Sequence, residues 1–312
     1  MRITFITPSY APYIGGVEKH VEGIVKVLSK NHQVTIVTEQ KDAKAVGYEK
    51  KNNLEIYRIP TYDISEKNKK WRIWSWILKN HELLNNSDVI HVHDVMYWLY
   101  PYKLLHPLKK VYITFHGWEG IYPIPLKNII LHKLNEFLAA GNICVGDFIA
   151  KWYYTRPDTV TYGAVEVPVY RPKVISKSLL FIGRLAEDTG FRECLDLGWP
   201  LVVVGDGPLK YLLPKNANFL GFVPHPEKYI AAANHVYASG YLTILESFVQ
   251  NKIVLASYSN PVRRDYLTMH PMGKFLGLNG DIPKVASQAA YNWAQDQTWA
   301  KLVSQYQSIW QK

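Results

Sequence analysis

The sequence predicts an α/β protein of two doubly wound, Rossmann-like domains that face each other across a cleft. The first observation is a set of short β-branched runs, SLLFIGRL, PLVVVGDGP and NFLGFV, that each end in a glycine-marked turn. A further run, HVYASGY, leads directly into the helical segment LTILESFVQN. Strands that stop at glycine and restart as helices are typical of βα units in a parallel sheet. The second observation is the length of 312 residues, which suffices for two domains with separate cores.

The alternation of strands and helices runs along both halves of the chain. In the first half, strands are expected over 2–7, 33–38, 54–59, 88–93, 110–115, 142–145 and 159–162, with helices near 16–30, 69–84, 95–106, 126–138 and 146–153. The segment VEVPVYRPKVISKS interrupts the pattern with Pro and Lys, which predicts a linker near 166–177. Beyond it, strands are expected near 179–183, 201–204, 218–222, 235–238, 253–256 and 274–276.

The composition is that of a globular protein, with 48% hydrophobic and 20% charged residues. No apolar run approaches the roughly 18 residues that span a bilayer. The opening MRITFITPSY lacks the apolar core of a secretory signal, so a cytoplasmic protein is expected. Cys144 and Cys194 are expected to lie in different domains, which disfavours a disulfide framework.

The net charge of +10 is spread evenly. Residues 1–168 hold 21 Lys and Arg against 16 Asp and Glu, and residues 169–312 hold 15 against 10, so each half carries +5. Neither half is a basic arm, and the sequence shows no zinc-ligand set or RNA-binding motif, which disfavours a nucleic-acid-binding protein. An anionic lipid surface or a phosphorylated donor accounts for the excess charge.

Two side chains near the predicted carboxyl edge of the second sheet indicate the class of ligand. Ligands of doubly wound sheets bind at that edge, and phosphates favour helix N-termini. Arg184 comes directly after the first strand of the second half, and Glu246 lies one turn inside the helix that follows HVYASGY. An anion-binding arginine and a carboxylate that can hold vicinal hydroxyls are what a nucleoside diphosphate sugar requires. The sequence therefore predicts a nucleotide-sugar site.

Blocks of sequence along nearly the whole chain support a resemblance to a known family. The N-terminal half contains PSYAPYIGGVEKHVEGIVKVLSKNHQVTIVT, then DVIHVHD and VYITFHG. The C-terminal half contains FIGRL, VVVGDGP, FLGFV and LTILES in that order, and closes with TWAKLVSQYQSIWQK. These blocks resemble those of GT-B glycosyltransferases of the retaining family 4 type.

The resemblance implies an acceptor-side domain over 1–168, a nucleotide-sugar-binding domain over 169–296, and a final helix over 297–312 that crosses back to the first domain. It implies a hexosyltransferase that moves a sugar with retention from a UDP- or GDP-type donor to a hydroxyl acceptor, such as a lipid or a lipid-linked glycan. It also implies no metal and no cofactor, because helix dipoles and basic side chains hold the diphosphate.

Three residues match catalytic positions of that family: His116 at the donor sugar, Arg184 on the diphosphate and Glu246 on the ribose. The donor site as a whole is expected to combine turn glycines, the first turn of a helix and the loop that frames the base. Its predicted members are Gly15, Gly16, Gly183, Arg184, Thr189, Gly205, Asp206, Phe222, Val223, Gly240, Tyr241, Leu242, Thr243 and Glu246.

His91 and His93 alternate on a predicted strand, and Asp94 follows at its carboxyl end. With His116 nearby, this pattern could also ligate a metal, whereas the resemblance implies a metal-free enzyme. On that account His93 and Asp94 are expected on the acceptor side of the cleft. His91 is expected to be a core residue with satisfied hydrogen bonds.

Two positions depart from the family pattern. Thr189 stands where the family usually has a lysine, so one of two cations on the leaving group is missing. The first glutamate of the family's Glu-x7-Glu element would fall at Ala238, or in a short deletion between Ser239 and Gly240, and neither supplies a carboxylate. These departures support an alternative, a non-catalytic GT-B pseudoenzyme or a nucleotide-sugar-binding partner subunit. A sugar-nucleotide epimerase of similar fold fits the motif order less well.

The segment EKNKKWRIWSWILKN, residues 66–80, combines five basic residues with three tryptophans. This mixture suits a membrane interface and a peripheral position at the inner face of the membrane. The alternative is an amphipathic helix packed on the sheet, with its lysines merely solvated. The candidate membrane contacts are Lys69, Lys70, Trp71, Arg72 and Trp74.

Overall fold

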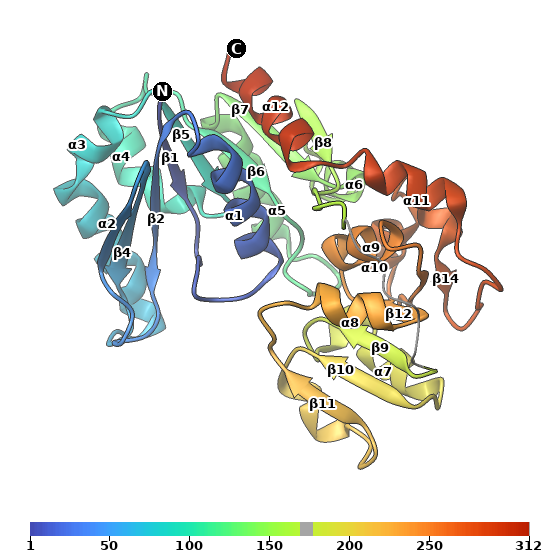
Figure 1. Cartoon of the computed structure of the whole chain (residues 1–312). Coiled ribbons are helices and arrows are strands. Elements are labelled where there is room, and N and C mark those ends of the chain that lie inside the picture. The colour runs from blue at the N-terminus through green and yellow to red at the C-terminus, as the bar shows by residue number, and fades with distance from the viewer. Residues whose placement is uncertain (169–176, 312) are drawn as a thin grey trace.

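The computed structural model describes residues 1–168 and 177–311. It contains two α/β units, each built on its own sheet, and the last helix returns from the second unit to the first (Figure 1). The linker predicted near 166–177 falls largely on residues 169–176, outside the described residues. The two units supply the two faces between which a ligand site can form.

The first unit is an eight-stranded sheet in the order β3-β4-β2-β1-β5-β6-β7-β8. Its neighbouring strands are parallel, except that the edge strand β3 pairs antiparallel with β4. The strands are β1 (Arg2–Ile6), β2 (Gln33–Gln40), β3 (Tyr48–Lys51), β4 (Leu54–Pro60), β5 (Val89–His93), β6 (Tyr112–Phe115), β7 (Gly141–Val145) and β8 (Thr159–Thr161).

Helices cover both faces of this sheet, as buried parallel strands require. On one face, α1 (Gly16–Leu28) packs against the returning helix α12 (Trp299–Trp310), with Val21, Ile24 and Tyr306 in a shared core. The other face is covered by α2 (Glu66–Lys79), α3 (His81–Asn85), η1 (Met96–Leu99), α4 (Tyr100–Leu105), α5 (Leu126–Leu138) and α6 (Asp147–Tyr153).

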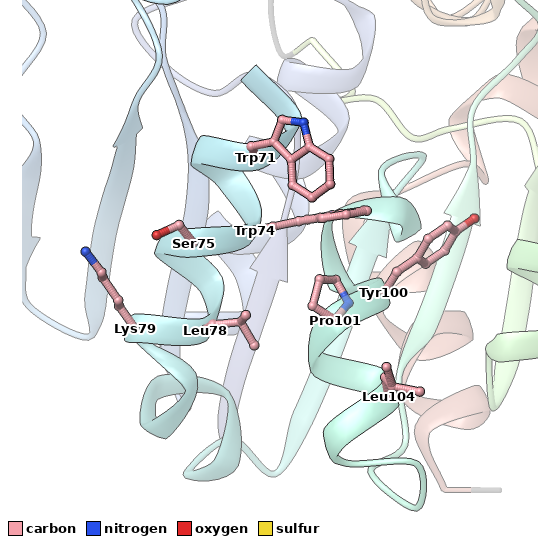
Figure 2. Close-up of a pocket in the computed structure, with 8 residues that line it drawn as sticks. All are labelled: Trp71, Trp74, Ser75, Leu78, Lys79, Tyr100, Pro101 and Leu104. Carbon is pink, nitrogen blue, oxygen red and sulfur yellow. The ribbon is translucent and has the colours of Figure 1, made fainter. Parts of the chain in front are cut away.

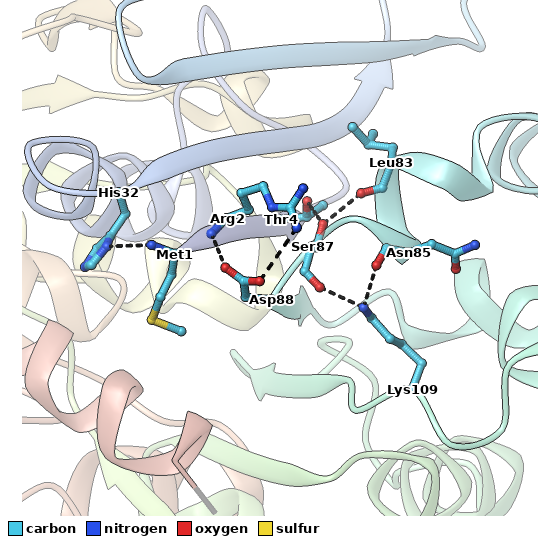
Figure 3. Close-up of polar contacts among 9 residues, drawn as sticks. All are labelled: Met1, Arg2, Thr4, His32, Leu83, Asn85, Ser87, Asp88 and Lys109. Carbon is cyan, nitrogen blue, oxygen red and sulfur yellow. Dashed lines mark hydrogen bonds and ion pairs between the residues drawn. The ribbon is translucent and has the colours of Figure 1, made fainter.

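Polar contacts fasten the amino edge of the first sheet (Figure 3). The backbone N–H of Arg2 donates to Asp88 at 2.7 Å, and the hydroxyls of Thr4 and Ser87 lie 2.7 Å apart. The Lys109 ammonium donates to the carbonyls of Asn85 and Ser87. These groups bind one another, so this edge holds the strands together, and the opposite, carboxyl edge is left for a ligand.

The second unit is a six-stranded parallel sheet in the order β11-β10-β9-β12-β13-β14. Its strands are β9 (Leu179–Ile182), β10 (Leu201–Val204), β11 (Asn218–Gly221), β12 (His235–Ala238), β13 (Ile253–Ala256) and β14 (Gly277–Leu278). Its helices are η2 (Glu187–Thr189), α7 (Phe191–Asp196), η3 (Pro208–Leu212), α8 (Glu227–Ala232), α9 (Tyr241–Phe248), α10 (Pro261–Thr268), η4 (Gly273–Phe275) and α11 (Gln288–Gln295).

An aromatic contact joins the two units. Phe148 of α6 lies edge-on to Tyr266 of α10 at 5.1 Å between ring centroids, and Tyr162 lies edge-on to Tyr241 of α9 at 5.3 Å. Beside them, Lys151 forms an ion pair with Asp265 at 2.5 Å. The buried apolar residues around these rings form one continuous cluster that includes residues of both units. The two units are therefore joined by a shared apolar core as well as by polar contacts.

The predicted elements match the observed ones closely, with four differences. The helix predicted over 95–106 is the 3-10 turn η1 followed by the short helix α4. The strand predicted at 274–276 is wrong, because Gly273–Phe275 forms a 3-10 turn and the strand is Gly277–Leu278. The edge strand Tyr48–Lys51 was missed, because its charged, exposed residues carry no apolar period. The helix predicted over 69–84 is two helices divided at Asn80, whose side-chain amide donates to the Trp76 carbonyl at 2.8 Å.

Within residues 1–168 and 177–311, no helix combines the length and the apolar character that crossing a bilayer would take.

Candidate functional site

The carboxyl edge of the second sheet is formed by loops that approach one another backbone to backbone. Gly183 and Gly205 follow the paired strands β9 and β10, with φ angles of 149° and 131° that favour glycine. A Cβ on Gly205 would lie 1.9 Å from the carbonyl oxygen of Gly183. A Cβ on Gly183 would lie 1.7 Å from the hydroxyl of Ser239, which follows β12. Three strand ends thus converge at the predicted donor site.

Arg184 follows Gly183 and extends to solvent, with its side chain 67% exposed. Its guanidinium donates to the carboxylate of Asp188 at 2.7 Å. Thr189 is buried, and its hydroxyl lies within hydrogen-bond distance of the carbonyls of Arg184 and Ala186, at 2.8 and 2.7 Å. Thr189 therefore holds the shape of the Arg184 loop from within, so its hydroxyl is not directed to a ligand.

Glu246 lies one turn inside α9, and its side chain is 8% exposed. Its carboxylate forms an ion pair with the ammonium of Lys19, which stands in the first turn of α1 in the other unit. Burial raises the pKa of the Glu246 carboxyl, and the charge of Lys19 opposes that rise. Because Lys19 and Glu246 are joined, the start of α1 and the start of α9 lie next to each other.

The first turn of α9 has only part of its anion-binding capacity free. Gly240 precedes the helix, and the Tyr241 amide, expected to face a phosphate, instead donates to the hydroxyl of Tyr266 at 2.6 Å. The two tyrosine rings stack at 3.9 Å between centroids, and a second hydrogen bond joins the Tyr241 hydroxyl to the Tyr266 carbonyl. The amides of Leu242 and Thr243 lie in the same turn, where an α-helix offers them no internal acceptor.

The missing glutamate of the second unit has a structural explanation. Ala238 is the last residue of β12 and is fully buried, so a carboxylate at that position would lie in the core. Only Ser239 and Gly240 separate β12 from α9. The connection is therefore only two residues long, and neither residue carries a carboxylate.

The remaining predicted donor residues lie in loops of the same sheet. Asp206 follows β10, and the Gly207 amide that donates to its carboxylate at 2.8 Å lowers its pKa. Phe222 follows β11 with 57% of its surface exposed, whereas Val223 is partly buried against the core. Phe222 thus has an exposed aromatic face that a base could stack on.

Gly15 and Gly16 open α1, as predicted, with Gly15 as the cap residue and Gly16 as the first residue of the helix. A Cβ on Gly15 would lie 2.2 Å from the carboxylate of Glu18, whereas nothing lies within 4 Å of a Cβ on Gly16. The carboxylate of Glu18 therefore lies at the end of α1 that favours an anion. A phosphate at that end would displace Glu18.

His93 and His116 meet at the carboxyl edge of the first sheet, with Nδ1 of His93 2.8 Å from Nε2 of His116. Burial lowers the pKa of both imidazoles well below the usual range, so both are neutral at pH 7. Nε2 of His93 is buried without a partner. A proton on Nδ1 of His93, donated to His116, avoids burying an unpaired N–H. His116 then carries its own proton on Nδ1.

Asp94 fixes the loop that carries His116. Its carboxylate accepts from the His116 backbone N–H at 2.9 Å, and its own φ of 63° places it in the left-handed region at the end of β5. Burial raises the pKa of Asp94 to about 7, although the His116 amide opposes that rise. Asp94 therefore shapes the loop after β6. This loop lies close to the second unit, because a Cβ on Gly120 would approach the Asp188 carboxylate to 3.1 Å.

A buried network behind the histidines was not predicted. Tyr306 of α12 has its hydroxyl 2.9 Å from Nε2 of His20 and 2.8 Å from the hydroxyl of Thr114. Nε2 of His91 contacts Thr114 at 2.8 Å, and its Nδ1 accepts from the Trp310 indole at 3.0 Å. His91 is thus the satisfied core residue that was predicted. His20 and Tyr306 carry no local sequence signal, because their partners come from segments far along the chain.

The helix α2 holds the five candidate membrane contacts in different environments. Ile73 and Ile77 are buried in the core, whereas Trp71 is 61% exposed. Lys70 lies over the rings of Trp71 and Trp74, and the Trp74 indole donates to the Tyr97 carbonyl at 2.8 Å. Lys69 instead pairs with Glu39 and Glu66. Arg72 lines a second groove on the other side of the helix.

An apolar groove of about 870 Å³ runs between α2 and α4, with Trp71, Trp74 and Leu78 facing Tyr100, Pro101 and Leu104 (Figure 2). One face of α2 therefore packs on the sheet, and the other exposes Trp71.

In the described part of the chain, no group of three His, Cys, Asp or Glu side chains is arranged to hold a metal ion.

Comparison with known proteins agrees with this architecture. Residues 14–159 match the family model described as Glycosyltransferase Family 4. No curated protein sequence matches the chain. Among solved structures, sucrose-phosphate synthase from Thermosynechococcus elongatus superposes with a TM-score of 0.73 at 12% identity, over 99% of this chain and 98% of that one. HepE of Anabaena, in complex with UDP and glucose, has a TM-score of 0.64 at 13% identity, with the same coverage.

A glycosyltransferase from Rickettsia africae has a TM-score of 0.60 at 13% identity, over 99% of this chain and 98% of that chain. Identities this low establish the fold alone. The chain therefore has a two-unit fold like that of these solved structures, and residues 14–159 of its first unit are similar in sequence to Glycosyltransferase Family 4.

Proposed function

We propose that the chain transfers a hexosyl group from a UDP- or GDP-type sugar to a hydroxyl acceptor, with retention of configuration at the sugar. The observation that carries this proposal is the position of Glu246, buried one turn inside α9 beside the strand end that carries Arg184. A carboxylate in such a place can accept hydrogen bonds from ribose hydroxyls, while Arg184 binds phosphate oxygens. The UDP in the Anabaena HepE structure supports a uridine donor for a protein of this fold.

The proposed chemistry needs no protein nucleophile. The bond between the anomeric carbon and the diphosphate oxygen breaks as the acceptor oxygen bonds to the same face, and the acceptor proton passes to the leaving diphosphate. Arg184 and the free amides of α9 stabilise the growing negative charge, without a metal or other cofactor. The neutral His116 donates from Nδ1 to an oxygen of the donor, and His93 holds it in that tautomer. His93 and Asp94 line the acceptor side.

A nucleotide-binding protein without transferase activity is the second candidate. Two observations favour it. The position expected to supply a carboxylate to the donor sugar is Ala238, which is buried in the core, and the Arg184 guanidinium is already paired with Asp188. Such a protein would bind the nucleoside diphosphate and would not turn over a donor sugar with any acceptor.

The proposed location is cytoplasmic, at the inner face of a membrane, where a lipid or lipid-linked glycan is the acceptor. Besides Trp71, large apolar side chains are exposed on the neighbouring helices α4 and α5, which a hydrogen bond from Tyr100 to Asn135 joins at 2.7 Å. They are Leu104 (82% exposed) and Leu105 (65%) of α4, and Leu126 (70%), Ile130 (58%) and Phe137 (84%) of α5, with Leu108 (94%) in the segment after α4. Lys103, Lys127 and Lys133 lie on the same two helices, and exposed apolar side chains accompanied by lysines suit an anionic bilayer.

The donor site is tested by thermal shift with UDP, GDP, ADP and their common sugar conjugates, on the wild type and on Arg184→Ala. A ligand at one hundred times its dissociation constant adds about 2.7 kcal/mol of stability. We expect a shift with one nucleotide family that is lost in Arg184→Ala. Lys284→Ala, which removes an exposed basic side chain of the same unit outside the predicted donor loops, is the control. No shift with any nucleotide would refute the donor site.

The membrane location is tested by sedimentation with phosphatidylcholine vesicles, with and without phosphatidylglycerol. We expect the wild type to sediment with the anionic vesicles, and the double variant Leu104→Ser/Phe137→Ser to stay in the supernatant. Val285→Ser, which removes an equally exposed apolar side chain from the second unit, should sediment like the wild type. Equal behaviour of the double variant and the wild type would contradict the assignment of this surface.

A further inference from the structure

Arg263 is a buried arginine whose charge has no carboxylate partner among the residues that the structure describes. It lies on α10 with 4% of its surface exposed. Its Nε is 3.4 Å from the Ser257 carbonyl, its guanidinium carbon is 4.7 Å from the centroid of the Tyr266 ring, and one terminal nitrogen is buried with no hydrogen-bond partner.

The nearest acidic residue on the same helix does not neutralise Arg263. Asp265 pairs with Lys151 and with the exposed Arg264, and it also accepts from the Trp152 indole. Arginine stays protonated in proteins, and a buried charge without a counter-ion is strongly unfavourable. A carbonyl and an aromatic ring compensate only part of that charge. The arrangement therefore leaves a positive charge for an anion that the described residues do not supply.

The position of Arg263 indicates where such an anion would bind. Ser257 follows β13, at the same edge of the sheet as Arg184 and α9. A Cβ on Gly190 would lie 3.5 Å from the Ser257 carbonyl, so the loop of Thr189 passes next to this point. Tyr266, whose ring faces Arg263, binds the Tyr241 amide at the start of α9. Arg263 thus lies on the buried side of the point where the loop of Arg184 and the start of α9 come together.

We propose that Arg263 supplies the second positive charge of the diphosphate site, in place of the lysine that is missing at Thr189. The inference rests on the proposed nucleotide-sugar donor and names the residue that holds its diphosphate. The charge of Arg263 reaches the diphosphate from the buried side of the site, behind Tyr266 and the first turn of α9. Arg184 contributes its charge from the solvent side. A charge in this buried position is little screened by water, so it attracts a diphosphate more than an exposed lysine would.

The experiment measures dissociation constants by calorimetry for inorganic pyrophosphate and for the nucleoside, monophosphate and diphosphate of the base that the donor screen selects. The variants are Arg263→Met, Arg263→Gln and Arg263→Lys. For Arg263→Met and Arg263→Gln we expect about a tenfold loss of affinity for the diphosphate and for pyrophosphate. The affinity for the nucleoside should stay unchanged, because only the phosphate groups face the lost charge. Arg263→Lys should retain most of the affinity.

The control is Arg264→Met, which removes the neighbouring exposed guanidinium and should bind all ligands like the wild type. A parallel loss of nucleoside and diphosphate affinity in Met and Gln would mean a purely structural role and would overturn the inference, as would unchanged diphosphate binding. If the Arg263→Met variant does not fold, the dissociation constants of Arg263→Gln and Arg263→Lys are compared instead. Wild type that binds pyrophosphate through Arg263 but no nucleotide would refute the proposed function alone, and wild type that binds neither would refute both.

Discussion

The ion pair between Lys19 and Glu246 joins one residue of each unit. Glu246 is nearly buried, whereas Lys19 is 38% exposed, so the pair is asymmetric. Ribose hydroxyls bound to Glu246 would have to share its carboxylate with Lys19. The pair therefore bears on nucleotide binding as well as on stability.

Lys19→Met should destabilise the protein by about 1–2 kcal/mol at pH 7, because it leaves a buried carboxylate without its counter-charge. Burial already raises the pKa of Glu246, and the loss of Lys19 raises it further, so the destabilisation should shrink as the pH falls and Glu246 takes up a proton. Urea unfolding at pH 5 and pH 8 measures this. The double variant Lys19→Met/Glu246→Gln should recover most of the stability, and a double variant no more stable than Lys19→Met would contradict the account.

Asp94 predicts a second pH effect. Its pKa is about 7 in the folded chain, against an ordinary value of 3.8. Between these values the folded state holds a proton that the unfolded state has released, so this residue lowers stability as the pH rises from about 4 to 7, and the loss stays constant above that.

Asp94→Asn keeps an oxygen for the His116 amide and removes the titration. We therefore expect its stability relative to the wild type to increase by about 4 kcal/mol at most between pH 4 and pH 8, since one pKa unit corresponds to about 1.4 kcal/mol. Chemical unfolding at several pH values gives the difference. A constant difference across that range would show that the carboxyl is not perturbed.

At the scale of elements, the loops at the carboxyl edge of the second sheet depend on glycine for their close approach. Gly205→Ala should cost about 3 kcal/mol or more, because its Cβ would lie 1.9 Å from the Gly183 carbonyl and φ is 131°. Gly280→Ala is the matched control: φ is also positive, at 90°, but nothing lies within 4 Å of the added Cβ, so about 1 kcal/mol is expected. Thermal unfolding of both variants compares them, and equal losses would show that crowding is unimportant.

Most elements could be predicted because their signal is local. The helix over 126–138 and the strands over 201–204, 235–238 and 253–256 have the predicted bounds, since apolar period and flanking glycines mark them. Where tertiary pairing decides, the prediction failed: β14 is two residues long and exists only through its pairing with Leu255 and Ala256.

The site could be predicted only where a motif marks it. Arg184, Glu246 and the glycine turns stand in recognisable blocks, and the structure places them at one edge. The contacts that complete the site join residues far apart in sequence, such as Lys19 with Glu246 and Tyr306 with His20. No periodicity or spacing in the chain encodes such a pair, so these contacts were not foreseen.

At the scale of the whole molecule, the shared aromatic core predicts cooperative unfolding. Because Phe148 and Tyr162 pack on Tyr241 and Tyr266, neither unit can unfold without exposing rings of the other. We expect tryptophan fluorescence and far-ultraviolet circular dichroism to report one coincident urea transition. Phe148→Ala should separate the two probes, because it removes a fully buried ring from that contact. Two transitions in the wild type would show that the units are thermodynamically independent.

The helix α12 has a consequence for how the protein is made. Tyr306, Ile309 and Trp310 complete the core of the first unit against Phe5 and His91, near the beginning of the chain. The ribosome adds these side chains after all of residues 1–168, so the first unit emerges without the helix that completes its core and contacts its histidine network. Final folding of the first unit must therefore wait until α12 has emerged, and a nascent chain that stops before α12 exposes the apolar surface that a chaperone binds.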